Sequence, residues 1–194
     1  AQEARVADVN GNPVAGVTVN WIVAGGGSVN PTSSVTDASG VASTVRTLGA
    51  TAGTQTTTAS ATLSTGAASV VFTATATVGG ATQMALQAGD AQADTVGATL
   101  AIPLAVVVRD ALSNPAAGVL ISWSVVTGGG TVSPLTSTTN ALGVATTAWT
   151  LGTTVTPTDS TQSARATGVA SPVGFIATAR PGAVNAGQTL VSVA

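Results

Sequence analysis

The chain has 194 residues, of which 44% are hydrophobic and only 6% are charged, and its formal net charge is −2. Ordinary globular domains carry about 25% charged residues, and a nucleic-acid-binding surface needs clustered Lys and Arg, so this composition excludes nucleic acid as a partner. Because the chain has no Lys, His, Cys or Tyr, catalytic triads, Schiff bases and thiolate chemistry are excluded as well.

One carboxylate pair remains for acid–base chemistry, Asp90 and Asp94, and no aromatic or basic residue lies near it in sequence to form a substrate cleft. We therefore expect a protein that is not an enzyme and that has no cofactor. The longest apolar stretch, 96–108, contains Pro103 and is shorter than the roughly 20 residues of a membrane-spanning helix, so we expect no membrane insertion. No basic and apolar leader opens the sequence, and we expect any secretion signal to have been removed.

The sequence repeats itself with a period of about 100 residues, which is the size of a whole sandwich domain. Residues 8–48 and 110–152 contain the same motifs in the same order. The equivalent positions include Asp8 and Asp110, Pro13 and Pro115, Trp21 and Trp123, and Phe72 and Phe175. The repeat predicts two domains, 1–80 and 81–181, followed by a segment of residues 182–194.

Apolar residues alternate with polar ones in both copies, which is the pattern of a strand with one buried face. In residues 17–23 and 119–125 the apolar face consists of Val17, Val19, Trp21 and Val23, and of Val119, Ile121, Trp123 and Val125. Turn-forming Asn, Asp, Gly and Pro residues separate such segments, and no segment has a helical period. This pattern predicts antiparallel β-sandwiches. We expect the Thr-rich segment 51–58 to be a flexible or modified loop.

The run D-x-N-G-N-P-V-A-G-V-x-V-x-W, which begins at Asp8, is followed by G-G-G and D-A-S-G-V-A. These motifs resemble the bacterial immunoglobulin-like group 1 domains, which form the stalks of intimin- and invasin-type adhesins. The resemblance implies two tandem immunoglobulin-like antiparallel β-sandwiches that act as a rigid extracellular spacer at the bacterial cell surface. Two departures between the copies, Ser113 for Gly11 and Asn140 for Asp37, affect turns and leave the alternation intact.

The two copies differ where they begin. Copy two opens with residues 81–98, whereas copy one has no counterpart of this segment before Asp8, so we predict that the first sandwich lacks its first strand. The final residues Gln188–Ala194 resemble Gln83–Gly89 and predict an extra C-terminal strand. We expect the two features to be complementary between subunits, so that copies join head to tail into a cell-surface filament. The predicted donor residues are Leu190, Val191 and Val193, and the predicted acceptor residues are Val6, Trp21 and Phe72.

Two alternatives stay open. In the first, the sequence is a part of a longer array of such domains, and the protein is a rigid stalk segment of a monomeric adhesin. A carbohydrate-binding module is the other alternative, and it requires an exposed aromatic platform. Trp149 is the candidate, since it aligns with Arg46; we expect it to contact another domain or subunit, unless a local loop covers it. A host or neighbouring cell surface is a further expected partner.

Residues Asp8–Asn12 resemble the opening of a calcium-binding loop, with oxygen-bearing side chains at alternate positions. The loop lacks the glycine that the sixth position needs, which is Pro13, and the glutamate that the twelfth needs, which is Val19. Asn and Asp beside Gly and Pro are ordinary turn formers. The sequence therefore predicts a turn here and no metal site.

Overall fold

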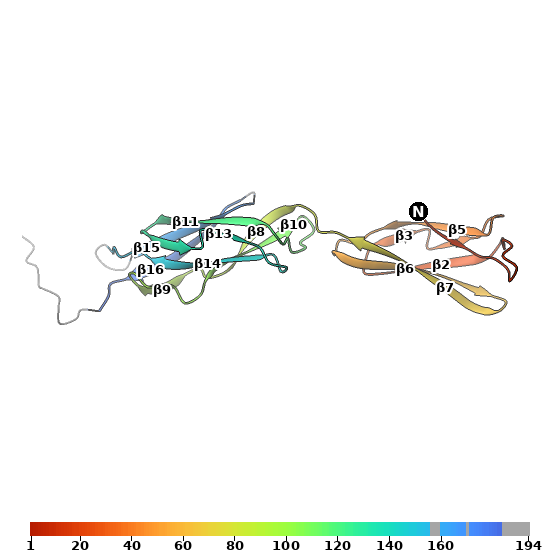
Figure 1. The fold of residues 1–194 in the computed structure, drawn as a ribbon, viewed down its shortest axis with the longest axis horizontal. Coiled ribbons are helices and arrows are strands. Elements are labelled where there is room, and N and C mark those ends of the chain that lie inside the picture. Colours follow the sequence, from red (N-terminus) through yellow and green to blue (C-terminus); the bar gives the residue numbers. More distant parts are fainter. Residues whose placement is uncertain (156–159, 170, 184–194) are drawn as a thin grey trace, which may run out of the picture. The chain divides into compact units, whose positions relative to one another are not determined.

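The structure, a computed structural model, describes residues 1–155, 160–169 and 171–183. These residues form strands and turns, and among them no helix is long and apolar enough to cross a membrane. The chain divides into two compact units, which are coloured red to yellow and yellow-green to blue in Figure 1. Unit 1 contains residues Ala1–Val78, and unit 2 begins at Gly79.

Unit 1 is a sandwich of two antiparallel sheets. One sheet has the strand order β1-β5-β3 and the other the order β4-β2-β6-β7. The strands are β1 (Gln2–Arg5), β2 (Thr18–Ala24), β3 (Ser28–Asn30), β4 (Ser33–Val35), β5 (Val41–Thr47), β6 (Gly53–Leu63) and β7 (Gly66–Ala76). Because β6 pairs with β7 from Gly53 to Leu63, the prediction that residues 51–58 form a flexible loop is wrong for most of that segment. Within β6, Thr54, Thr56 and Thr58 share the more exposed face, and Thr57 lies on the buried face.

Unit 2 repeats this sandwich and adds one strand to each sheet. Its sheets have the orders β12-β14-β10-β8 and β13-β11-β15-β16-β9. The strands are β8 (Ala81–Ala88), β9 (Gln92–Thr95), β10 (Leu104–Asp110), β11 (Leu120–Thr127), β12 (Gly130–Ser133), β13 (Thr136–Thr138), β14 (Val144–Leu151), β15 (Ser160–Thr167) and β16 (Val173–Arg180). The added strands are β8, antiparallel to β10, and β9, parallel to β16. The all-β fold class and the immunoglobulin-like sandwiches predicted from the sequence are thus confirmed.

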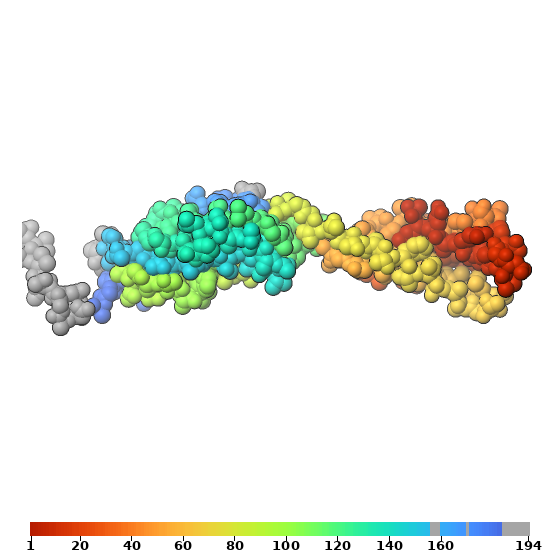
Figure 2. Space-filling view, in the orientation of Figure 1, coloured from red at the N-terminus to blue at the C-terminus, as the bar shows by residue number. Residues whose placement is uncertain are grey.

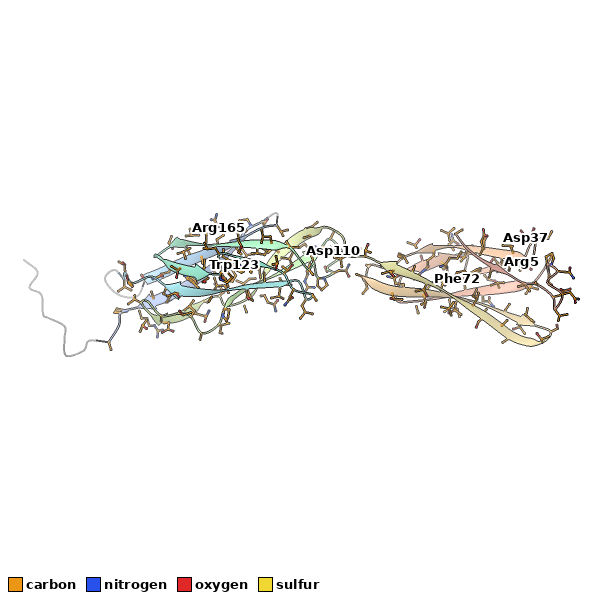
Figure 3. The ribbon with its side chains drawn as sticks, viewed as in Figure 1. Arg5, Asp37, Phe72, Asp110, Trp123 and Arg165 are labelled. Carbon is orange, nitrogen blue, oxygen red and sulfur yellow. The ribbon has the colours of Figure 1, made fainter. Side chains whose placement is uncertain are left out.

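The core of each unit is centred on one Trp–Phe pair, as the alternating pattern predicts. Trp21 and Phe72 lie with ring centroids 5.9 Å apart, and Trp123 and Phe175 lie 6.0 Å apart. Figure 3 labels Phe72 in unit 1 and Trp123 in unit 2. The indole N–H of Trp21 donates to Ser34 Oγ at 2.9 Å, so this buried polar group is satisfied. The inward valines of the same strands pack around these rings.

Candidate functional site

The strand β1 of unit 1 occupies the place of β10 in unit 2. Gln2 lies opposite Thr44 on β5, and Ala4 lies opposite Ala42. In unit 2, β10 and β14 make the equivalent pairs, Leu104 with Thr147 and Val106 with Ala145. The repeated register therefore lets the two units be compared residue by residue.

The two strands differ at their other edge. In unit 2, β8 pairs with that edge of β10, and Met84 lies opposite Val108. In the part of the chain that the structure describes, β1 pairs with β5 alone. An unpaired edge leaves a row of backbone N–H and C=O groups available to another strand. Unit 1 thus has an open sheet edge where unit 2 has a closed one.

A groove lies beside this open edge. It has a volume of about 240 Å³ and runs between β1 and the strands β6 and β7, and its lining includes Ala4, Val6, Val19, Ala59, Leu63 and Val70. The red residues of β1 and the yellow residues of β7 lie beside each other on the face of unit 1 in Figure 2. In unit 2, Met84 of β8 packs against the core instead. The groove is therefore the place where unit 2 holds a side chain of its first strand.

Of the predicted acceptor residues, only Val6 lines this groove. Trp21 is buried, with 3% of its surface exposed, and Phe72 is half-buried on β7. The equivalent Phe175 is only 1% exposed. In unit 2, β9 pairs with Ala177–Arg180 of β16 and β8 also contacts β16, and unit 1 has a described counterpart of neither strand. The predicted donor residues Leu190, Val191 and Val193 lie outside the described residues.

Trp149 was expected to be a surface contact, and that expectation is wrong. Its side chain is 0% exposed, and it belongs to the core of unit 2. The covering segment is the chain between β9 and β10: Leu100 N–H donates to the Trp149 carbonyl at 2.9 Å, and Leu151 N–H donates to the Ala98 carbonyl at 2.9 Å. This segment lies about fifty residues earlier in the sequence. The pattern of residues around Trp149 therefore does not indicate that Trp149 is covered.

The Asp8 loop is a turn, as predicted. Asp8 Oδ1 accepts the backbone N–H groups of Asn10 and Asn12 at 2.9 and 2.8 Å, and Oδ2 accepts Asn12 Nδ2 at 3.0 Å. The hydrogen bond from the Asn12 side chain is the main cause that lowers the pKa of Asp8. With its oxygens occupied by local donors, the carboxylate closes the turn. The described residues hold no group of three or more acidic side chains that could bind a metal ion.

Unit 2 contains the same turn with one additional donor. Asp110 accepts Leu112 N–H and Asn114 N–H, and its Oδ2 also accepts the backbone N–H of Gly79 at 2.9 Å. The bond from the Asn114 side chain, followed by that from Gly79 and other backbone donors, lowers the pKa of Asp110 to about 2. Gly79 lies two residues before β8, so this hydrogen bond from Gly79 to Asp110 fixes the segment that precedes the first strand of unit 2. The turn in unit 1 has the same geometry, with Asp8 exposed.

The remaining carboxylate pair has structural contacts. Asp90 Oδ1 accepts the backbone N–H of Ile176 at 2.8 Å, which joins the loop after β8 to β16. Asp94, on β9, accepts the backbone N–H of Thr95 at 2.7 Å. Hydrogen bonds of this kind fix loops and strand ends.

No protein-family model matches the sequence, and no curated protein matches it. Among solved structures, the D0-D1 domain of intimin is similar to this chain with 22% identity and a TM-score of 0.38, covering 92% of this chain and 87% of that one. The crystal structure of invasin, a bacterial integrin-binding protein, has 23% identity and a TM-score of 0.37, and covers 91% and 35%. Domains 4–9 of the surface layer protein SbsC have 14% identity and a TM-score of 0.42, and cover 92% and 25%. Intimin and invasin, to which the sequence resemblance pointed, are thus among the structural neighbours; the fold class itself rests on the strand pairing above.

Proposed function

We propose that this chain is a non-enzymatic structural protein of the bacterial cell surface, whose copies join head to tail by donating a β-strand. Residues 183–194 of one copy pair with the open edge of β1 in unit 1 of the next copy. One observation carries the proposal: in unit 1 the edge of β1 and its apolar groove are open at the place that β8 and Met84 fill in unit 2.

The sequence of the C-terminal segment supports its role as the donor. Gln188–Ala194 resembles Gln83–Gly89 of β8, and in an extended strand Thr189, Val191 and Val193 share one face. Strand addition supplies main-chain hydrogen bonds along the edge, while alternate side chains fill the groove. Because the donor and the acceptor are different surfaces, the contact does not close on itself and produces a filament.

The described contacts favour this proposal over the carbohydrate-binding alternative. That alternative needs an exposed aromatic platform, and its candidate, Trp149, is buried. The two Asp residues considered for catalysis, Asp90 and Asp94, hold backbone groups in place. A stalk segment of a monomeric adhesin remains the competing function, and a host or neighbouring cell surface remains an expected partner of either.

Aspartate on the groove-facing side of the donor should abolish assembly. We expect V191D together with V193D to convert the polymer to monomers, because two carboxylates would have to leave water for a groove lined mostly by apolar side chains, in which Arg5 is the one lining cation and can pair with only one of them. Sedimentation velocity and electron microscopy measure the change. Ser192→Asp, on the opposite face of the same strand, is the matched control and should still assemble.

The unmodified chain also decides between the two functions. Filaments that survive in the double variant would contradict donation by this segment. An unmodified chain that stays monomeric at all concentrations would favour the stalk.

A further inference from the structure

The four-stranded sheet of unit 1 ends in an edge strand without charge. Among the described strands, β7 pairs with β6 alone, along 11 residues and without a register shift. The sequence from Thr47 to Gly89 contains no charged residue and no proline. Natural edge strands are usually protected by Lys, Pro, a β-bulge or a short length. The strand β7 has none of these four protections.

A row of three side chains crosses the outer face of each sheet towards this edge. In unit 1 the row consists of Ile22, Thr58 and Val71. In unit 2 it consists of Ser124, Arg165 and Gly174. The two rows correspond, because each begins one residue after the core Trp of its unit and ends one residue before the core Phe. They can therefore be compared position by position.

The two rows differ in charge and in apolar surface. In unit 2 the exposed Arg165 lies opposite Gly174, which has no side chain, so a strand added at this edge would have to displace water from the guanidinium. Figure 3 labels Arg165. In unit 1, Ile22 is 64% and Val71 is 56% exposed. Unit 2 thus protects this edge with a charge, whereas unit 1 has an apolar row that extends to it.

The central part of the edge is open in both units. In unit 2, β9 pairs with Ala177–Arg180 of β16, and the counterparts of these residues in unit 1 begin at Ala74, since Phe175 and Phe72 are equivalent. The strand β8 pairs with β10 in the other sheet. Residues 69–73 of β7 therefore lie outside the range of a strand placed like β9. We name these five residues the β7 edge.

We infer that the β7 edge binds the β7 edge of a second copy in antiparallel orientation, which joins the two sheets into one. The segment is self-complementary about Val71. Because directly opposite residues lie on the same face of a sheet, a two-fold axis at this residue places Val70 opposite Phe72 of the second copy. On the outer face it places Ser69 opposite Thr73 of the second copy. Apolar side chains thus meet apolar ones, and hydroxyl groups meet hydroxyl groups.

A second copy fits this edge because the contact repeats the chemistry of the edge itself. The two Val71 side chains meet at the axis, which joins the apolar rows of the two copies. Val70 is exposed and Phe72 is half-buried in one copy, and the pairing covers both. The strands β2, β4, β6 and β7 contain no charged residue, so the two sheets do not repel each other.

The contact goes beyond the proposed function and does not depend on it. The strand β1, which accepts the donor in that proposal, belongs to the other sheet of unit 1. A two-fold contact closes on itself and links two copies side by side. Five paired residues make a small interface, so one pair is weak, and many pairs act together when copies are arrayed on a surface. The β7 edge is therefore suited to adhesion between surfaces that display this chain.

Bead aggregation tests this contact. The beads carry the full chain through a cysteine added after Ala194, which is specific because the chain has no cysteine of its own. Every chain also carries V191D and V193D, which block strand donation. We expect these beads to aggregate. The variant T58R/V71G, which gives unit 1 the residues of unit 2 at both positions, should reduce aggregation at least about tenfold.

Thr18→Arg is the matched control. It adds the same charge at an exposed position of β2 on the same face, two strands away from β7, and beads that carry it should aggregate like the parent beads. Thermal unfolding checks that each variant is folded. Should T58R/V71G fail to fold, Thr58→Arg alone places the charge beside the edge and should also reduce aggregation.

Three results would overturn the inference: parent beads that stay dispersed, T58R/V71G beads that aggregate like the parent beads, or Thr18→Arg beads that lose aggregation to the same extent. Because the donor segment is blocked on every bead, none of these results bears on strand donation.

Discussion

Trp149→Ala is expected to destabilise unit 2 by about 3–5 kcal/mol, the usual cost of removing a large aromatic side chain from a core. The indole is 0% exposed and packs in the cluster that contains Leu100 and Leu104. For a domain of about 100 residues this lowers the melting temperature by more than about 12 °C. Differential scanning calorimetry of the full chain measures it, and the transition of unit 1 should not move.

Arg46→Ala is the matched control, since Arg46 takes the position of Trp149 in unit 1. Arg46 is half-buried and loses mainly its hydrogen bonds to Gly26 and Gln55, so we expect a cost of about 1 kcal/mol in unit 1. A Trp149→Ala variant that is no less stable than the Arg46→Ala variant would contradict the burial of Trp149 and restore the surface role expected from the sequence.

Met84→Asp is expected to destabilise unit 2 by about 3 kcal/mol or more. Met84 and Ala81 are the residues of β8 that pack against the core, and a carboxylate at the partly buried position of Met84 would lose part of its hydration. The loss should appear in thermal unfolding as a lower transition of unit 2. It measures how strongly unit 2 depends on an apolar side chain at the position of β8 that corresponds to the open groove in unit 1.

Ala85→Asp serves as the control for Met84→Asp. Ala85 is the next residue of β8, and its side chain is exposed on the other face of the strand. We expect its effect to stay within about 0.5 kcal/mol. If both variants have the same small effect, β8 is not anchored through Met84. Unit 2 would then not indicate which side chain fills the groove in unit 1.

Local patterns in the sequence predict the sandwiches well, because a strand with one buried face must alternate. Val19 and Trp21 are buried and Ile22 is exposed, as the period of two requires. The same rule predicts the inward side of β16, where Phe175, Ala177 and Ala179 are buried.

The rest depends on contacts between distant segments, which alternation does not encode. Phe72 occupies the position of Phe175 and yet remains half-buried, and in unit 2 both β8 and β9, which have no described counterpart in unit 1, contact β16. Trp149 is buried by Leu100 and its neighbours, and no feature of its own strand indicates this. The segment 51–58 is rich in Thr, which suggested a loop, but Thr is also a good strand former.

The central claim is that the edge of β1 accepts residues 183–194 of another copy. In unit 2, Val107 lies opposite Ala85. Arg5 takes the position of Val107, because it lies opposite Val41 as Val107 lies opposite Val144. If Gln188 corresponds to Gln83, then Leu190 corresponds to Ala85. The chain has no cysteine, so an engineered pair is the only source of a disulfide.

Oxidation of the variant Arg5→Cys/Leu190→Cys, followed by non-reducing electrophoresis, tests this contact most directly. Donation between copies predicts a ladder of covalent multimers. The control pair Val35→Cys/Leu190→Cys, with Val35 exposed on β4, should remain monomeric. A monomeric product from the Arg5 pair, or the same ladder from both pairs, would contradict the account.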